Sequence, residues 1–377
     1  MNKIMNMLKE SLFNLPTPVN ISYWWNFGSL LGMFLFIQII SGFFLSMHYC
    51  ANINLAFYSV IHIMQNVGGG WLMHNIHING ATFFFLCMYI HMARGIYYGS
   101  FKLIYTWVLG VSIFFISMGT AFLGYVLPWG QMSFWGATVI TNLVSTIPYI
   151  GNMVVMWIWG GFSINNSTLS RFFSLHFILP FVILVMVVLH LYFLHFSGSS
   201  NPLGLNSDYS KVSFHIYFTF KDLLGFVVVL GVFLFIILQY PYMFGDSDNF
   251  IFANSMVTPV HIQPEWYFLF AYAILRSIPS KLGGVVALLM SILVLYLLPL
   301  NKLLIQSMGF YFLGQFIYWL FINIFILLTW AGAQVIEVPY VYISQFLSFL
   351  YFMFFLVLIM INKLNFYILF GVKKSGG

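Results

Sequence analysis

The chain has 377 residues, of which 62% are hydrophobic and only 5% are charged. Because soluble globular proteins carry about 25% charged residues, this composition excludes a water-soluble protein and indicates one that lies within a membrane. The formal net charge is +6, but so apolar a chain offers no basic surface for a nucleic acid, and we expect no nucleic-acid binding.

Eight apolar runs are each long enough to cross a bilayer as a helix, which takes about 20 residues. They cover residues 27–47, 75–97, 105–127, 168–196, 216–239, 283–301, 311–332 and 341–362. Residues 1–20 are expected to form a short surface helix that ends before Pro16 and Pro18. The sequence therefore predicts an all-α integral membrane protein with eight transmembrane helices.

Two connecting segments are much longer than the others. Residues 128–167 are too apolar for a solvated tether and are predicted to form one or two short surface helices, whereas residues 240–282, rich in proline and aromatics, are predicted to pack as a lid. The most polar stretch, residues 197–212, is predicted to separate an N-terminal domain, 1–210, from a C-terminal domain, 211–377.

Basic residues are distributed unequally between the two sides of the membrane. Eight spans bring both termini to one side, called side N, and place both long loops on the opposite side P. Side P holds Arg171, Arg276 and Lys281, whereas side N holds Lys3, Lys9, Arg94, Lys102, Lys211, Lys221, Lys302, Lys363, Lys373 and Lys374. By the positive-inside rule, side N is the cytoplasm-like or matrix-like side.

Four histidines lie within the apolar runs, in two pairs with the same spacing. His77 and His91 are 14 residues apart in the second span, as are His176 and His190 in the fourth. Fourteen helical residues place both members on nearly the same face, roughly 21 Å apart along the axis. Since these two spans are parallel, His77 is level with His176, and His91 with His190. Each level suits one haem iron bound by two neutral imidazoles for electron transfer.

A single histidine of this kind is more simply a polar side chain hydrogen-bonded inside a bundle, but four at one spacing favour iron ligands. The same 14-residue spacing recurs in glycines of the first and third spans, where a missing Cβ lets a flat macrocycle approach; helix packing is the alternative. These residues are Gly28, Gly42, Gly110 and Gly124. Arg94, one turn beyond His91, suits a haem propionate or anchors the membrane edge.

Ionisable residues at the membrane edges indicate proton transfer, although each has an equally good structural interpretation. Glu265 can accept a proton from a bound hydroquinone at side P, or cap a short helix after Pro264. His195 and Asp222 can deliver protons to a reduced quinone at side N, or anchor and cap the ends of their helices. Cys50 and Cys87 form no metal-binding or haem-attachment motif.

From about Asn14 to Lys363 the chain closely resembles the mitochondrial cytochrome b family, the quinone-handling subunits of the cytochrome bc1 complex (respiratory complex III). Four motifs carry the resemblance: the two histidine pairs, the segment GYVLPWGQMS at 124–133, Arg171-Phe172-Phe173 before His176, and Pro264-Glu265-Trp266-Tyr267.

The resemblance implies two haem b groups: a low-potential haem near side P bound by His77 and His176, and a high-potential haem near side N bound by His91 and His190. It implies a quinol-oxidation pocket on side P formed by Phe122, Tyr125, Met132, Gly136, Ile140, Pro264, Glu265, Phe268 and Tyr272. A quinone-reduction pocket on side N would include Ser29, His195, Ser199, Lys221 and Asp222. Glu265, Tyr272, His195 and Asp222 would then be the catalytic residues.

The implied activity is that of ubiquinol–cytochrome c reductase, of which this chain would be one subunit, inactive alone. Ubiquinol is oxidised on the intermembrane-space side, and one electron crosses two b haems to ubiquinone on the matrix side, coupled to proton translocation in a Q cycle. The implied partners are the Rieske iron–sulfur protein, cytochrome c1, other subunits of a dimeric complex III, and membrane lipids. The implied location is the mitochondrial inner membrane, with both termini in the matrix.

Three positions depart from the family pattern. His74 replaces an arginine that usually pairs with a propionate of the side-P haem, Met156 replaces an acidic residue, and Ser200 stands where many members have asparagine. Two other functions remain as alternatives: a di-haem membrane anchor of another quinone-linked dehydrogenase, and a proton-coupled transporter.

Overall fold

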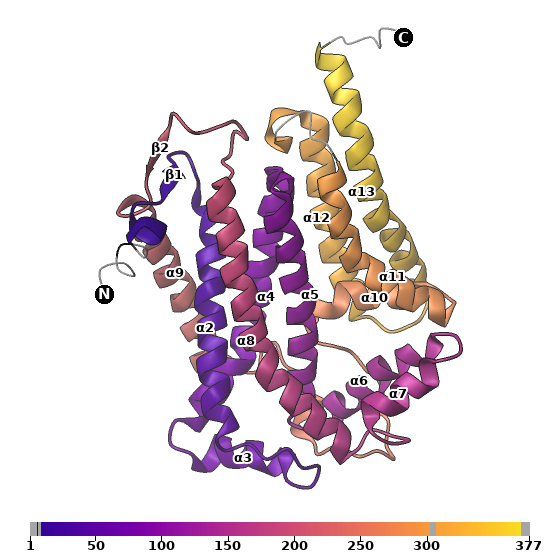
Figure 1. Ribbon diagram of the computed structural model, residues 1–377. Helices are drawn as coiled ribbons and strands as arrows, with labels where there is room; N and C mark the ends of the chain where they lie inside the picture. The colour runs from indigo at the N-terminus through magenta and orange to yellow at the C-terminus, as the bar shows by residue number, and fades with distance from the viewer. Residues whose placement is uncertain (1–5, 7–8, 302–306, 371–377) are drawn as a thin grey trace.

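The computed structural model describes residue 6 and residues 9–301 and 307–370. Within these residues, eight helices are long and apolar enough to span a membrane, which confirms the predicted fold class (Figure 1). They are α2 (Phe27–Ser46), α4 (Gly70–Tyr97), α5 (Ile104–Val126), α8 (Asn166–Ser197), α9 (Tyr217–Gln239), α11 (Lys281–Leu293, continued by the 3-10 helix η7, Val294–Leu300), α12 (Phe312–Gly332) and α13 (Tyr340–Phe370). Lys3, Lys302, Lys373 and Lys374 lie outside the described residues.

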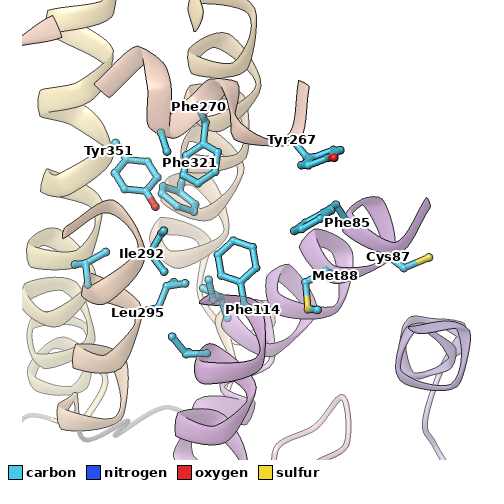
Figure 2. Packing of buried hydrophobic residues seen from close by; sticks show 14 of the residues in the cluster. Phe85, Cys87, Met88, Phe114, Tyr267, Phe270, Ile292, Leu295, Phe321 and Tyr351 are labelled. Carbon is cyan, nitrogen blue, oxygen red and sulfur yellow. The ribbon is translucent and has the colours of Figure 1, made fainter. Parts of the chain in front are cut away.

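The first four spans form a bundle in which α2 packs against α4, and α5 packs against α8. The fifth span, α9, packs against α2 and α4, on the side of the bundle away from α11–α13 (Figure 1). A short helix, α10 (Leu269–Ser277), packs against α11, α12 and α13. One hydrophobic core joins the two groups of helices, with Phe85 and Phe114 on one side and Phe270, Phe321 and Tyr351 on the other (Figure 2).

The long loops contain the predicted short helices. They are α6 (Gln131–Asn142), the 3-10 helix η4 (Leu143–Thr146) and α7 (Gly151–Trp159) in the first loop, and the 3-10 helices η5 (Ser247–Phe250) and η6 (Trp266–Phe268) in the second. The two loops are joined by hydrogen bonds: Gln131 N donates to Ile251 O (2.9 Å), and Ala253 N donates to Trp129 O (3.2 Å). A further surface helix, α3 (Ala56–Asn66), was not anticipated from the sequence.

A two-stranded ribbon lies at the opposite end of the bundle. After one helical turn, η1 (Lys9–Phe13), the chain enters strand β1 (Pro16–Pro18), which pairs antiparallel with β2 (Lys211–Ser213). Thr17 is opposite Val212 in this pairing. The ribbon ties the N-terminal segment to the polar connection between α8 and α9, so neither segment extends freely into solvent.

Helix α8 begins with a capping box that also secures the end of α7. Asn165 Oδ1 accepts a hydrogen bond from Ser167 N (2.9 Å), and Thr168 Oγ1 accepts one from Asn165 N (3.2 Å). The fully buried Thr168 hydroxyl donates its own proton to the carbonyl of Trp159, the last residue of α7, at 2.7 Å. One hydroxyl therefore joins the surface helix to the membrane span.

Replacing Thr168 by valine keeps the shape of the side chain but leaves a part-buried carbonyl and a part-buried amide without these partners. We expect a loss of about 1–3 kcal/mol of stability, because buried unsatisfied groups keep their desolvation cost. Thermal unfolding of the purified protein in detergent measures the loss. Ser174→Ala, which removes an exposed hydrogen bond within the same helix, is the control; equal melting temperatures for both variants would contradict the assignment.

Candidate functional site

The four paired histidines face one another across the bundle at two levels. The ring centroids of His77 and His176 are 6.2 Å apart, and those of His91 and His190 are 6.4 Å apart. A bond from an imidazole nitrogen to a first-row metal is about 2.0 Å long, and the nitrogen lies about 1.1 Å from the ring centre, so one metal ion fits between centroids about 6 Å apart. Each level has room for one ion bound by two imidazoles.

Each imidazole lies against a glycine of the neighbouring helix. A Cβ added to Gly42 would lie 2.9 Å from Cε1 of His77, and one on Gly110 would lie 3.1 Å from Cε1 of His190. At the other two positions, Gly28 faces His91 and Gly124 faces His176, and a Cβ on Gly124 would collide with the His176 ring. The glycine spacing therefore follows the histidine spacing because the imidazole itself occupies the space that a Cβ would fill.

Hydrogen bonds set the protonation of the side-P pair. His176 Nδ1 lies 2.8 Å from the carbonyl oxygen of Thr120, which can only accept, so Nδ1 carries the proton. His77 Nδ1 lies 2.9 Å from Ser41 Oγ, and that hydroxyl already donates to Ile37 O at 2.7 Å. His77 Nδ1 is therefore also the donor. In both rings Nε2 is left unprotonated and can act as a metal ligand.

Arg94 is the permanent cation beside the side-N pair. Its guanidinium lies 5.0 Å from the ring centroid of Trp25 and donates to His91 Nδ1 at 3.2 Å. Its Nε is buried and has no hydrogen-bond partner among the described residues. An arginine with an unused buried donor suits a carboxylate ligand.

One cavity of about 600 Å³ connects the side-P histidines with the long loops. His77 and His176 line it together with Tyr125 and Glu265, two residues predicted for the side-P quinol pocket. Its walls are mostly apolar with a few convergent polar groups, as is typical of sites for small molecules and cofactors. Residues that line it but were not predicted as site residues include Asp246, Asn249, Tyr267 and Gln38.

The charges around this cavity differ from those at side N. Among the described residues that line it there is no lysine or arginine, whereas Asp246 and Glu265 bring two carboxylates. His74, the residue in place of the family's arginine, lines it as well, and its Nδ1 is buried without a hydrogen-bond partner within the described chain. The side-P level therefore has no permanent cation in its wall.

Glu265 does not act as a helix cap. It precedes η6, but its side chain makes no capping hydrogen bond. Burial raises the pKa of the Glu265 carboxyl to about 8, and the nearby carboxylate of Asp246 also contributes. A carboxyl with its pKa near neutral pH can exchange protons with a bound substrate.

The other residues predicted for the side-P pocket lie outside the lining of this cavity. They are Phe122, Met132, Gly136, Ile140, Pro264, Phe268 and Tyr272. Met132 and Gly136 are buried in α6, and Phe122 packs edge-on against Phe172. The hydroxyl of Tyr272 donates to Ile262 O at 3.0 Å, and the guanidinium of Arg276 lies 5.0 Å from its ring centroid.

The predicted side-N residues are brought together only in part. The Asp222 carboxylate interacts with the Ser29 hydroxyl. Lys221 Nζ donates to Ile21 O at 2.8 Å. His195 lies in the last turn of α8 and Ser199 in the loop that follows. In the part of the chain that the structure describes, no hydrogen bond links His195 to Ser29 or Asp222.

Ser200, one of the departures from the family pattern, is buried and pairs with Ser100, the two hydroxyl oxygens being 2.6 Å apart. Met156, another departure, is exposed on α7.

Three residues that line the side-P cavity were not predicted from the sequence: Asp246, Asn249 and Tyr267. The sequence shows that Asp246 is an acidic residue in a loop rich in proline and aromatics. This pattern alone does not predict that Asp246 lines the cavity.

Comparison with known proteins agrees with this arrangement. The chain matches the family models described as cytochrome b/b6/petB over residues 12–198 and cytochrome b(C-terminal)/b6/petD over residues 252–352. It is 60% identical over 344 residues to cytochrome b of Apis mellifera ligustica, covering 91% of this chain and 90% of the bee protein. A solved chain of a hyperthermophilic respiratory complex III matches with a TM-score of 0.91 at 33% identity, covering 97% of each chain. The chain therefore belongs to the cytochrome b family, the quinol-oxidising electron-transfer subunits of respiratory complex III.

Proposed function

We propose that this chain binds two b haems, one between His77 and His176 and one between His91 and His190. Binding of haem b and interaction with quinone belong to the family; the assignment of four ligands rests on the two facing imidazole pairs, whose centroid separations suit one metal ion each. The haems supply reversible one-electron redox chemistry. A haem held by two histidines would supply electron transfer in preference to oxygen or substrate binding.

Binding of iron by the side-N pair requires a change in the hydrogen bond between Arg94 and His91. Because Arg94 donates to His91 Nδ1, the proton of a neutral His91 resides on Nε2. Ligation through Nε2 needs that hydrogen bond to be released. A haem propionate is a stronger acceptor for arginine than a neutral imidazole nitrogen, so we assign Arg94 to a propionate of the side-N haem, and the unpaired Nε supports this role.

Charge also supports the order of the two haem potentials. A nearby cation stabilises the electron-rich form of a redox centre, and carboxylates do the opposite. Arg94 stands beside the side-N level, whereas the described wall of the side-P cavity holds the acidic residues Asp246 and Glu265, of which Glu265 is largely protonated near neutral pH, and no lysine or arginine. This difference in charge supports the assignment of the low-potential haem to His77 and His176 and of the high-potential haem to His91 and His190.

Quinol oxidation is proposed to take place at the side-P cavity, next to His77 and His176. Ubiquinol would release its protons there, with Glu265 as an acceptor and Asp246 beside it, and Tyr125 in the same wall. One electron enters the haem pathway, and the other must leave the chain. Cys50 is exposed and Cys87 is buried, both unpaired, so we assign the second electron to the Rieske iron–sulfur protein and then to cytochrome c1.

Quinone reduction is proposed at side N, where Asp222 and Ser29 come together at the ends of α9 and α2. His195, Ser199 and Lys221 would complete this site. Tyr272, held by Ile262 and Arg276, is proposed as a further catalytic residue at side P.

The complex III match shows that the chain works with other subunits of that complex. We propose a dimeric complex in the mitochondrial inner membrane with side N as the matrix side and both termini there. The unequal distribution of basic residues supports this orientation. We also retain the proposed division into domains 1–210 and 211–377, although β1 pairs with β2 across that boundary.

Replacing His190 by leucine should remove the side-N haem and leave the side-P haem, because only the side-N level loses a ligand. Visible redox spectra of the purified complex should then show one b-type band in place of two, while a single turnover of side-P quinol oxidation persists. Loss of both bands in a folded protein would contradict the pairing. A wild-type complex without two low-spin b bands would contradict the assignment of both histidine pairs.

Gly124→Ala should lower occupancy of the side-P haem several-fold, because the added Cβ collides with the His176 ring. Gly119→Ala in the same helix is the matched control, since its Cβ would meet nothing within 4 Å. The two b-type bands, measured separately by redox titration, report each site. The assignment fails when Gly119→Ala lowers the side-P band as much as Gly124→Ala does.

Glu265→Gln should slow side-P quinol oxidation on the order of a hundredfold to ten-thousandfold, the usual contribution of a general base. With its pKa raised to about 8, Glu265 accepts protons better as pH rises, so the wild-type rate should increase from pH 7 to 9. This dependence should disappear in Glu265→Gln. Asp246→Asn removes a like charge that raises the Glu265 pKa, and should shift the profile to lower pH.

Quinone reduction at side N serves as the internal control, because Glu265 lies at the other side of the membrane. Equal slowing of both half-reactions in Glu265→Gln, or an Asp246→Asn profile shifted to higher pH, would rule out the role of Glu265 as the local proton acceptor.

A further inference from the structure

One face of α4 packs against the segment that follows Glu265 and forms hydrogen bonds with it. Thr82, Phe85 and Tyr89 are spaced three and four residues apart, so they lie on the same face of the helix. Each contacts the segment 266–268. The hydroxyl of Tyr89 donates a hydrogen bond to the Tyr267 carbonyl, and Trp266 Nε1 donates to Thr82 Oγ1 at 3.3 Å.

Ring stacking reinforces these hydrogen bonds. Phe85 and Tyr267 lie face to face, with centroids 4.3 Å apart and planes inclined by 8° (Figure 2). Phe85 also meets Phe268 edge-on, with centroids 5.8 Å apart. Aromatic pairs at such separations are worth about 0.5–1.5 kcal/mol beyond their buried area. A third ring contact joins Tyr89 and Trp266, with centroids 6.4 Å apart. Two hydrogen bonds and three ring contacts therefore hold three consecutive residues against one helix.

The position of Glu265 depends on these contacts of residues 266–268, because Glu265 itself makes few hydrogen bonds. Its side chain makes no capping hydrogen bond, and its backbone carbonyl accepts a bond only from Phe268 N, at 2.9 Å, within the same segment. The carboxyl nevertheless enters the wall of the side-P cavity. The position of Glu265 is therefore determined by residues 266–268, which contact α4.

Helix α4 also carries His77, five residues before Thr82. A ligand and an anchor on one rigid helix keep a constant relation to each other, whereas two loops would not. The distance between His77 and the Glu265 segment is therefore set by a single element of secondary structure.

We infer that Tyr89, supported by Phe85 and Thr82, is a positioning residue that holds Glu265 in the side-P cavity at a constant distance from the His77–His176 level. Tyr89 touches neither ligand histidine nor the carboxyl. It acts through the backbone of Tyr267. The inference rests on the proposed role of Glu265 in quinol oxidation.

The test uses Tyr89→Phe in the whole complex. The matched control is Tyr318→Phe, because the Tyr318 hydroxyl also donates to a backbone carbonyl of α4, that of Ala93 at 3.2 Å, and both tyrosines line the same cavity. Tyr318 contacts no residue of the 264–268 segment through a hydrogen bond or ring stacking among the described residues. Both variants remove one hydroxyl and keep the ring, so both should fold and retain two b-type haem bands.

Infrared difference spectroscopy reads the carboxyl directly. Glu265→Gln identifies the C=O stretch of the protonated Glu265. Tyr89→Phe should shift or broaden that band, lower kcat of quinol oxidation between about threefold and a hundredfold, and move the pH profile, with KM almost unchanged. Tyr318→Phe should leave the band, kcat and the profile as in the wild type.

The inference is overturned when Tyr89→Phe leaves the Glu265 band and the pH profile unchanged, or when Tyr318→Phe has the same effects. Failure of the proposed function gives a different result. In that case Glu265→Gln leaves quinol oxidation unaffected, while Tyr89→Phe still shifts the carboxyl band, and the positioning role stands without the proton role.

Discussion

The contact between imidazole and glycine at two levels is the constraint on which the rest of the bundle depends. Four rings lie between the helices, and at Gly42, Gly110 and Gly124 the neighbouring helices α2 and α5 approach so closely that an added Cβ would crowd an imidazole, whereas at Gly28 it would make an ordinary contact. Because each histidine pair and each glycine pair repeat at 14 residues, the four helices must keep their register along nearly four turns. A slip of one residue would place a side chain against an imidazole at both levels together.

The two levels share this packing but differ in charge. At side P the histidines are held by neutral partners, a serine hydroxyl and a backbone carbonyl, beside a described cavity wall with two acidic residues and no lysine or arginine. At side N, Arg94 provides a cation that stacks over Trp25. Repetition of a histidine pair therefore does not produce two equal sites, because the surroundings of the two pairs differ in charge.

The sequence predicted the alignment of the histidine pairs, because helical spacing alone brings His77 level with His176. It also predicted the eight spans, whose length is set by the bilayer. It did not predict α3, whose 11 residues are too few for a span, or the ribbon β1–β2, in which two prolines pair with a distant loop. Asp246 and Tyr267 reach the cavity only because two loops far apart in sequence fold onto α4 and onto each other, and no local pattern records that contact.

Helix α4 both carries His77 and contacts the segment that follows Glu265. One of its faces presents His77 to the bundle, and another presents Thr82, Phe85 and Tyr89 to the segment after Glu265. An electron acceptor and a proton acceptor must both stay close to the same substrate, although they come from parts of the chain nearly 190 residues apart. A loop cannot hold such a distance unaided, because its backbone has few fixed partners. Attachment to the helix that carries His77 provides these partners, since a displacement of α4 moves His77 and the Glu265 segment together.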